Sequence, residues 1–234
     1  IAKFYLRVFG YPDVASQMRF PEVLKHLEPS SSDTILDVGS GLGLYSIHLA
    51  RDFNCKTVGL EGRQGRVVQS ETAAQALNLP TTFRKIDLEK ATLPPNHYDK
   101  IICLEVMEHI KNDKHLFSQM AQSLKKGGRL VITVPMADKT NEYRSFENFE
   151  HVRNGYTIQS VKDMGRYERL KLISVFPCFF LFTNLTTQIQ QFLYKNFHPV
   201  VNILFYPFLN TLAQLDNFFP IRSSARGIIT VFQK

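Results

Sequence analysis

Residues 34–50 constrain the fold of this chain more than any other segment. They begin with a short apolar run at 34–38, continue through glycines at alternate positions 39, 41 and 43, and end in an amphipathic helical pattern. Glycines spaced in this way allow positive φ angles and let the backbone approach a bulky ligand without an intervening Cβ. The segment therefore predicts a strand, a ligand-binding loop and a helix, as in open α/β sheets.

The spacing of these glycines also limits which ligand the loop can hold. The pattern G-x-G-x-G differs from the G-x-G-x-x-G of dinucleotide folds and from the G-x-x-x-x-G-K-[ST] of phosphate loops. No lysine follows Gly43, which argues against a triphosphate, and Asp37 offers an acceptor that suits a cationic or hydroxyl-bearing ligand. A strand–turn–helix that needs glycine only for tight packing is the structural alternative.

Acidic residues end the next apolar runs along the chain. Residues 57–61 end in Glu61, residues 83–87 end in Asp87, and residues 98–105 end in Glu105. An acid about 20 residues beyond the glycine loop holds ribose hydroxyls in nucleoside-binding α/β folds. The alternation of strand and helix patterns over 33–176 predicts a parallel, doubly wound α/β sheet. Within it, residues 125–135 are expected to form a helix end, a glycine turn and a fifth strand.

Five ordered motifs resemble those of class I S-adenosylmethionine (SAM) methyltransferases, and most closely the ubiquinone/menaquinone-biosynthesis type. They are residues 36–43, Gly59–Glu61, Asp87, 104–109 and 124–130. The resemblance covers about residues 15–176 and the last strand. It implies a Rossmann-like sheet of seven strands, the last one antiparallel, with helices on both faces and a hydrophobic, mainly helical insertion between strands six and seven.

The same resemblance implies SAM as the cofactor, S-adenosylhomocysteine as its product, and a role for each matching residue. Asp37 would receive the amino end of SAM, Glu61 the ribose hydroxyls, and Asp87 with the Leu88 backbone the adenine. Arg63 would flank the adenine, or would be a solvated surface arginine. The predicted cofactor-binding residues are Asp37, Gly39, Ser40, Gly41, Gly43, Glu61, Gly62, Arg63, Asp87, Leu88, Leu104 and Glu105.

His109 is the predicted catalytic base, because an unperturbed imidazole titrates near neutral pH. The alternative is a structural role, in which His109 caps the helix after strand four or packs against it. Glu105, Glu108 and His109 stand at i, i+3 and i+4, so a helix would place them on one face. With His151 they resemble the Glu-x-x-Glu-His pattern of metal-assisted O-methyltransferases. No metal is predicted, but this alternative stays open.

Residues 149–157 resemble the loop on the substrate side of the family. Thr157 is the expected N-cap of the following helix. His151, Arg153 and Tyr156 are predicted to face the substrate.

The chain divides into three expected regions: an N-terminal helical cap at 1–32, a SAM-binding core at 33–176 and 227–234, and an apolar insertion at 177–226. Between Lys171 and Asp216 the only charged residue is Lys195. Polar residues and prolines interrupt every apolar window of about 20 residues, which argues against a spanning helix. The apolar spacing predicts two helices, broken near residues 198–199 and at Pro207.

Three roles are open for the apolar insertion. It could be a lid over a pocket for a hydrophobic substrate, a surface that docks on a membrane, or a dimer interface or added core. The lid and the membrane surface are compatible with each other. The expected partners are therefore a small hydrophobic substrate, a membrane contacted peripherally through 177–226, and a second copy of the chain.

The net charge of +7 suggests an anionic partner, yet no basic run of five or more residues occurs, so nucleic acid is not expected. Three cysteines without metal-ligand or redox spacing and no visible secretory signal suggest a cytoplasmic protein, with membrane association left open.

The predicted function is methyl transfer to an oxygen or carbon of a lipophilic small molecule: a quinone or phenol, a lipid or a polyketide-like compound. The Asn/Asp-Pro-Pro-Tyr/Phe signature of amino-group methylation is replaced by residues 103–106, which favours oxygen or carbon. Metal-assisted O-methylation and RNA or protein methylation are the alternatives. A non-catalytic SAM-binding module is the least favoured.

Overall fold

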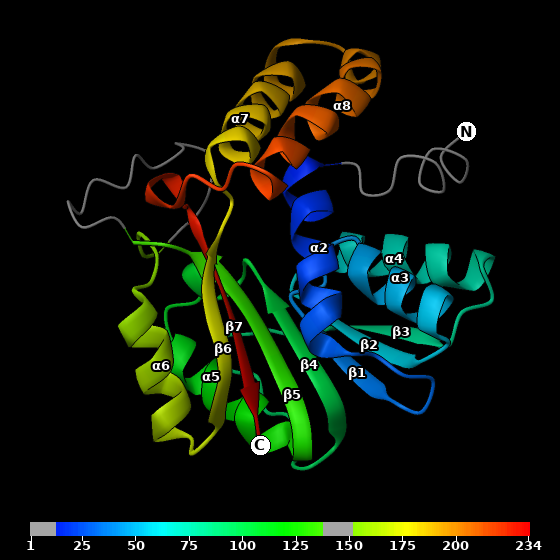
Figure 1. Cartoon of the computed structure of the whole chain (residues 1–234). Coiled ribbons are helices and arrows are strands. Elements are labelled where there is room, and N and C mark those ends of the chain that lie inside the picture. The colour runs from blue at the N-terminus through cyan, green and yellow to red at the C-terminus, as the bar shows by residue number, and fades with distance from the viewer. Residues whose placement is uncertain (1–12, 138–151) are drawn as a thin grey trace. The chain divides into compact units, whose positions relative to one another are not determined.

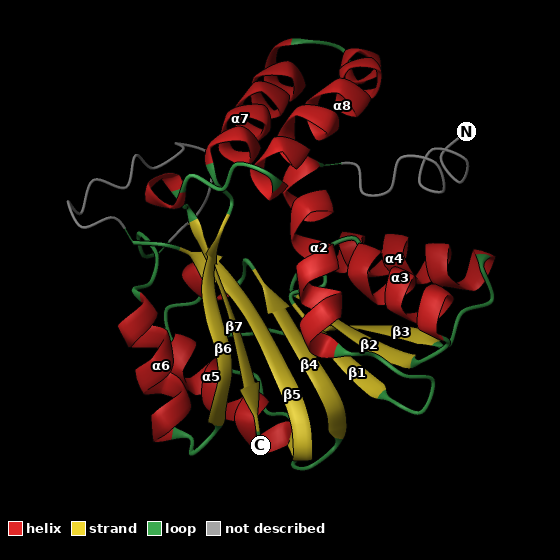
Figure 2. Ribbon diagram, viewed as in Figure 1, coloured by secondary structure: helices red, strands yellow, loops and turns green. Residues whose placement is uncertain are grey.

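A seven-stranded sheet forms the centre of the larger part of the chain, with strand order β3-β2-β1-β4-β5-β7-β6 (Figures 1 and 2). The computed structural model describes residues 13–137 and 152–234. Strands β1 to β5 are parallel, and Asp37 of β1 lies opposite Gly59 of β2 and Ile102 of β4. The strands are β1 (Thr34–Val38), β2 (Lys56–Glu61), β3 (Thr81–Lys85), β4 (Tyr98–Leu104), β5 (Leu124–Pro135), β6 (Lys171–Cys178) and β7 (Gly227–Gln233).

Strand β7 runs antiparallel to β5. The Gly127 N–H, near the beginning of β5, donates to the Lys234 carbonyl at 2.8 Å, and the Lys234 N–H donates to the Gly128 carbonyl at 3.1 Å. The end of β7 therefore lies at the beginning of β5. The predicted seven-stranded α/β sheet with an antiparallel last strand is confirmed.

Two compact units make up the chain. The larger is His26–Phe176 with Ile228–Lys234, and the smaller is Ile1–Lys25 with Pro177–Gly227. Helices α3 (Leu44–Phe53), α4 (Gln64–Ala76), α5 (Asp113–Ser123) and α6 (Ile158–Tyr167) belong to the larger unit, with the 3₁₀ turn η1 (Met107–His109).

The core of the larger unit is built from alternate residues of the central strands. Leu36 of β1, Ile101 of β4 and Ile132 of β5 are fully buried in one cluster with side chains of α5. Phe117 of α5 meets Phe232 of β7 edge to face, with ring centroids 5.6 Å apart. This packing fixes where each strand ends, and so where the polar residues that follow the strands lie.

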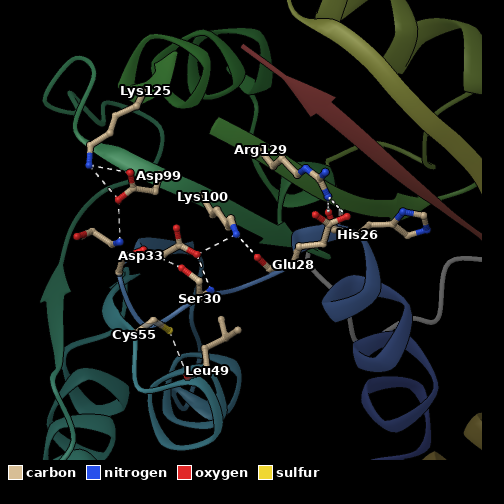
Figure 3. A network of polar contacts seen from close by, with 12 residues as sticks. His26, Glu28, Ser30, Asp33, Leu49, Cys55, Asp99, Lys100, Lys125 and Arg129 are labelled. Atoms are coloured by element: carbon tan, nitrogen blue, oxygen red, sulfur yellow. Dashed lines mark hydrogen bonds and ion pairs between the residues drawn. The ribbon is translucent and has the colours of Figure 1, made fainter. Parts of the chain in front are cut away.

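The amino ends of β1 and β4 are tied by a network of polar contacts (Figure 3). The Thr34 N–H donates to Asp99 at 2.9 Å, Lys125 pairs with the same carboxylate at 2.8 Å, and Lys100 pairs with Asp33 at 2.8 Å. These residues lie at the opposite end of β1 from the glycine loop. They hold the strands in place and take no part in the predicted ligand site.

Strand β5 differs from the expectation of a helix end and a glycine turn at 125–128. Helix α5 ends at Ser123 and β5 begins at once at Leu124, with a register shift against β4 between Tyr98 and Lys100. A Cβ on Gly128 would lie 2.6 Å from the Asp99 carbonyl oxygen. Gly128 therefore serves a close approach of two strands, whereas Gly127 has a left-handed φ of +80° with nothing within 4 Å of its Cβ position.

The smaller unit is helical in its described part. It holds most of α2 (Val14–Leu27), together with α7 (Leu181–Asn196), α8 (Pro199–Ala213) and the short turns η2 (Gln214–Asn217) and η3 (Arg222–Ser224). Val14, Tyr206, Leu209 and Ala213 form its buried apolar cluster. Among the residues that the structure describes, no helix has the length and apolar character needed to cross a membrane.

The predicted break between two helices occurs at residues 197–198, where His198 caps α8 and proline takes its first position. The second break, predicted at Pro207, is wrong because this proline lies inside α8. Its neighbours Tyr206 and Leu209 are buried in the cluster around Val14. Their burial holds the helix together although proline removes one backbone hydrogen bond.

Candidate active site

The glycine loop between β1 and α3 has a left-handed backbone at all three glycines, with φ of +75° at Gly39, +57° at Gly41 and +73° at Gly43. The N–H groups of Gly39 and Ser40 both donate to the Leu60 carbonyl at 2.8 Å. Non-glycine residues adopt this conformation at a cost of about 1 to 2 kcal/mol. The loop is thereby held against the end of β2.

Space around the glycines divides them into two kinds. A Cβ on Gly39 would lie 2.3 Å from Val106, and one on Gly43 would lie 2.4 Å from Phe83. A Cβ on Gly41 would meet nothing within 4 Å. Gly39 and Gly43 are thus required by packing, while Gly41 borders open space, a distinction that the spacing alone did not reveal.

Glu61 ends β2 beside the loop, and its carboxylate is buried. Its Oε2 accepts the Gly41 N–H at 3.1 Å and its Oε1 accepts the Arg63 N–H at 2.8 Å. The Arg66 guanidinium lies 3.8 Å from Oε2. The structure therefore brings the two predicted cofactor-binding residues Gly41 and Glu61 together, and each carboxylate oxygen keeps capacity for a further hydrogen bond.

Asp37, near the end of β1, is buried and receives a hydrogen bond from the Ser46 hydroxyl at 2.7 Å. Burial raises the pKa of Asp37 from 3.8 to about 7, the hydrogen bonds from Ser46 oppose this shift, and the negative charge of Glu61 adds to it. A cation bound nearby favours the ionised carboxylate. Two acids at this edge therefore suit a cationic ligand that carries hydroxyls.

The segment after β3 lies next to the end of β2. The Ile86 N–H donates to the Glu61 carbonyl at 3.0 Å. Asp87 is exposed two residues beyond β3 and accepts the Glu89 N–H at 3.0 Å, while Leu88 is buried. Gly62 and Arg63, which follow Glu61 in the sequence, are exposed. Their predicted roles toward adenine stay predictions.

The end of β4 is less regular than expected. Leu104 is buried, and Glu105 follows with a left-handed φ of +56°, its N–H bonded to the Thr133 carbonyl at 3.0 Å. The helical turn that follows is only the 3₁₀ turn η1. The expectation that Glu105, Glu108 and His109 share one helical face is therefore wrong, because the positive φ at Glu105 separates it from the turn.

His109 is partly exposed at the end of η1, whereas Glu108 beside it is buried; the His109 Nε2 lies 4.0 Å from the Glu108 Oε1. Within residues 13–137 and 152–234, no group of three or more His, Cys, Asp or Glu residues is placed to hold a metal ion. His151, the fourth residue of the metal alternative and a predicted substrate residue, lies outside the described residues.

Arg153 and Tyr156 converge on Asp113, the first residue of α5. The buried Tyr156 hydroxyl donates to Asp113 Oδ2 at 2.7 Å, and Arg153 pairs with the same oxygen at 2.9 Å. Arg153 also donates to the Ile110 carbonyl at 2.9 Å. These contacts hold residues 152–157 beside η1 and His109, and contact of Arg153 and Tyr156 with a substrate stays a prediction.

Thr157 caps α6 as expected, accepting the Ser160 N–H at 3.0 Å. Asp113 and Ser46 were not foreseen as partners of site residues. An acid in the first turn of a helix is a visible signal for Asp113. Its partner Tyr156 is 43 positions away, so only the fold could supply the pair.

The chain matches the sequence model of a methyltransferase domain family over residues 14–172. It is 26% identical over 167 residues to phosphoethanolamine N-methyltransferase 3 of Arabidopsis thaliana, covering 70% of this chain and 34% of that protein. It is 29% identical over 130 residues to a sterol 24-C-methyltransferase of Saccharomyces cerevisiae, covering 54% and 33%. The chain thus spans about a third of the length of these two relatives.

The fold is similar to that of a solved geranyl diphosphate C-methyltransferase from Streptomyces coelicolor A3(2), which contains Mg²⁺, geranyl diphosphate and S-adenosylhomocysteine. The TM-score is 0.68 at 16% sequence identity, and the match covers 94% of this chain and 80% of that one. At this identity the likeness is one of fold.

Proposed function

The chain belongs to the methyltransferase domain family of class I SAM-dependent enzymes, and from this premise we propose that it transfers a methyl group to an oxygen or carbon atom of a lipophilic small molecule. The acceptor classes that we propose are a quinone or phenol, a lipid, and a polyketide-like compound. The observation that carries methyl transfer is the cluster of Asp37, Gly41 and Glu61 at the carboxyl ends of β1 and β2.

The residues of this cluster fit SAM chemically. SAM supplies a methyl group activated on a sulfonium. Gly41 leaves open space where a Cβ would stand, and the Glu61 carboxylate beside it has the acceptor geometry for two vicinal hydroxyls. Asp37 would hold the cationic amino end, and its burial excludes water from that contact. Asp87 and Leu88 would meet the adenine.

His109 is the residue that we propose as the base. Its imidazole is partly exposed just beyond β4, next to the buried Glu108. An O–H acceptor must lose its proton as its oxygen is methylated, and a neutral imidazole can take that proton at physiological pH. The Glu108 carboxylate, 4.0 Å away, would stabilise the resulting imidazolium.

The lipophilic character of the acceptor rests on composition. Only Lys195 is charged between Lys171 and Asp216, so a large part of the smaller unit offers apolar surface. Among the relatives, one acts on a sterol and a solved neighbour holds geranyl diphosphate. We propose that the protein meets its acceptor as a peripheral membrane protein, with residues 177–226 contacting the lipid.

The test of the SAM site is a calorimetric titration with SAM of the wild-type chain and of Glu61→Ala. A hydrogen bond to a charged group contributes about 1.5 to 3 kcal/mol, so affinity should fall roughly tenfold to hundredfold. The matched control is Glu71→Ala, a carboxylate of α4 outside the cluster, which should bind as the wild type does. Unchanged affinity in Glu61→Ala would reject the assignment of Glu61.

The acceptor is tested by transfer of a labelled methyl group to quinones, phenols, lipid extracts, amines and tRNA. The expected result is a lipophilic product that carries the labelled methyl group on an oxygen or carbon atom. A preferred amine or tRNA acceptor would overturn the proposal. The assay is repeated with a chelator, where activity should persist; a loss that Mg²⁺ or Zn²⁺ restores would favour the metal-assisted alternative.

A further inference from the structure

Helix α7 buries polar side chains and exposes apolar ones, the reverse of a surface helix in water. Its buried residues are Thr183, Thr186 and Gln190. Its exposed residues include Leu181, Leu185, Ile189 and Phe192, spaced four, four and three positions apart on one face. A helix on the surface of a water-soluble protein buries its apolar stripe and exposes its polar one. The outer face of α7 is therefore built for an apolar surrounding.

Helix α8 also exposes a row of apolar side chains. Its exposed side chains include Leu204 at 70% and Phe208 at 66%, with Val200 and Ile203 beside them. These positions recur at three- and four-residue spacing, so they also form one face. The two helices pack against each other as neighbours in the smaller unit. We call their exposed apolar residues the outer face: Leu181, Leu185, Ile189, Phe192, Val200, Ile203, Leu204 and Phe208.

Polar side chains join the two helices on the inside. Gln190 of α7, 2% exposed, donates to Asn202 of α8, also 2% exposed, at 3.4 Å. The Gln190 Oε1 accepts the Val14 N–H at 2.9 Å. The contact between the two helices is therefore partly polar on the inside, while the exposed residues of α7 and α8 include a large apolar set.

The size of the pair sets the depth at which it could sit. Helices of 16 and 15 residues are about 24 and 22 Å long, shorter than the hydrocarbon core of a bilayer, about 30 Å. The pair therefore fits the boundary between headgroups and acyl chains, where amphipathic helices bury an apolar face without crossing.

The charged residues of segment 177–227 indicate which lipid headgroups the outer face would meet. Asp216 is the only acid in residues 177–227 and is buried, with its two oxygens accepting the N–H groups of Phe182 at 3.0 Å and Thr183 at 2.8 Å. The charged side chains that this segment exposes are Lys195, Arg222 and Arg226, all cationic. The acid Asp13, just before α2 in the same unit, interacts electrostatically with Tyr194 of α7. Cations at a membrane surface attract anionic headgroups.

We propose that α7 and α8 form a hairpin that inserts its outer face into the surface of an anionic bilayer, with Lys195 and Arg222 at the headgroups. This proposal specifies the membrane contact of the proposed function. It rests on the proposed function only for the identity of the acceptor that the protein would take from the membrane. Binding to lipid requires neither SAM nor an acceptor.

The experiment is sedimentation of the whole chain with vesicles of phosphatidylcholine alone and of phosphatidylcholine mixed with phosphatidylglycerol. The wild-type chain should bind the mixed vesicles more tightly, and added salt should weaken that binding. Phe192→Ser/Phe208→Ser should lower binding to mixed vesicles at least about tenfold, because each substitution removes the apolar area of one ring from the inserted face. Lys195→Gln/Arg222→Gln should reduce the preference for phosphatidylglycerol, because two of the three exposed cations of this segment are removed.

The matched control is Val68→Ser/Ile173→Ser, which removes two exposed apolar side chains from the larger unit and should bind vesicles like the wild type. Circular dichroism and SAM titration should be unchanged in every variant, so a failure of lipid binding is separate from a failure of methyl transfer. The proposal is overturned if the wild type binds neither vesicle or if the phenylalanine variant binds as well. A wild-type dimer in solution that the phenylalanine variant makes monomeric, with no vesicle binding, would assign the face to a second copy.

Discussion

The two units of this chain arrange polar and apolar residues in opposite ways. In the larger unit, Leu36 and Ile101 fill the core, and the acids Asp37 and Glu61 gather where strands end. In the smaller unit, α7 buries Gln190 and exposes Phe192. Periodicity in a sequence identifies a stripe on a helix, but which side of the helix is buried depends on what surrounds it.

Substitutions in the glycine loop should have the largest effect, because the larger unit depends on tight packing. Gly43→Ala combines a left-handed backbone with a Cβ 2.4 Å from Phe83. Strain and overpacking together should lower the free energy of unfolding by about 2 to 5 kcal/mol. Thermal and urea denaturation measure the loss.

Gly41→Ala is the matched control, since it has a similar φ but no neighbour within 4 Å. It should cost only the backbone strain, about 1 to 2 kcal/mol, and should weaken SAM binding more than this loss of stability explains. Equal destabilisation by both substitutions would contradict the division of the glycines into packing and ligand positions.

The buried polar groups of the smaller unit should matter next. Asp216→Asn weakens the cap on the first N–H groups of α7, which should destabilise that helix by about 1 to 2 kcal/mol. Hydrogen exchange should report faster exchange at Phe182 and Thr183. The exposed acid Asp163 of α6 is the control, and Asp163→Asn should leave those amides unchanged. Exchange at Phe182 and Thr183 as slow in Asp216→Asn as in the wild type would mean that the hydrogen bonds to Asp216 do not stabilise the start of α7.

The pH dependence of SAM binding should show the smallest effect. With its pKa raised to about 7 by burial, Asp37 is ionised in only about a tenth of molecules at pH 6 and in most at pH 8. Affinity for a cationic ligand should therefore rise by up to about tenfold across that range, measured by calorimetry, and the rise should vanish in Asp37→Asn.

The pH dependence of folding stability that comes from Asp37 has the opposite sign to the pH dependence of SAM affinity. The native state holds a proton that the unfolded state has released between the ordinary pKa of 3.8 and about 7, so the contribution of Asp37 to stability falls as pH rises through that window. SAM affinity that stays level from pH 6 to 8 in the wild type would contradict contact between Asp37 and the cationic end.

Much of the larger unit could be predicted because local chemistry and fold agree there. The left-handed glycine loop after β1, the carboxylate of Glu61 at the end of β2 and the Thr157 cap each occupy a place that follows from neighbouring residues in the sequence. The errors arose where distant packing overrides a local pattern. Pro207 stays helical because Tyr206 and Leu209 are buried, and Glu105 leaves the predicted helical face because its backbone is left-handed.

The order of the strands has a consequence for how the protein is made. Strand β7 lies between β5 and β6, although β6 precedes it in the sequence by the whole of α7 and α8. While the ribosome is still making those helices, β6 has no neighbour to pair with, and β5 has an open edge. The nascent sheet stays unfinished until β7 emerges and fills the gap, so synthesis that stops before β7 would leave one edge of β5 and the whole of β6 unpaired, a template for aggregation.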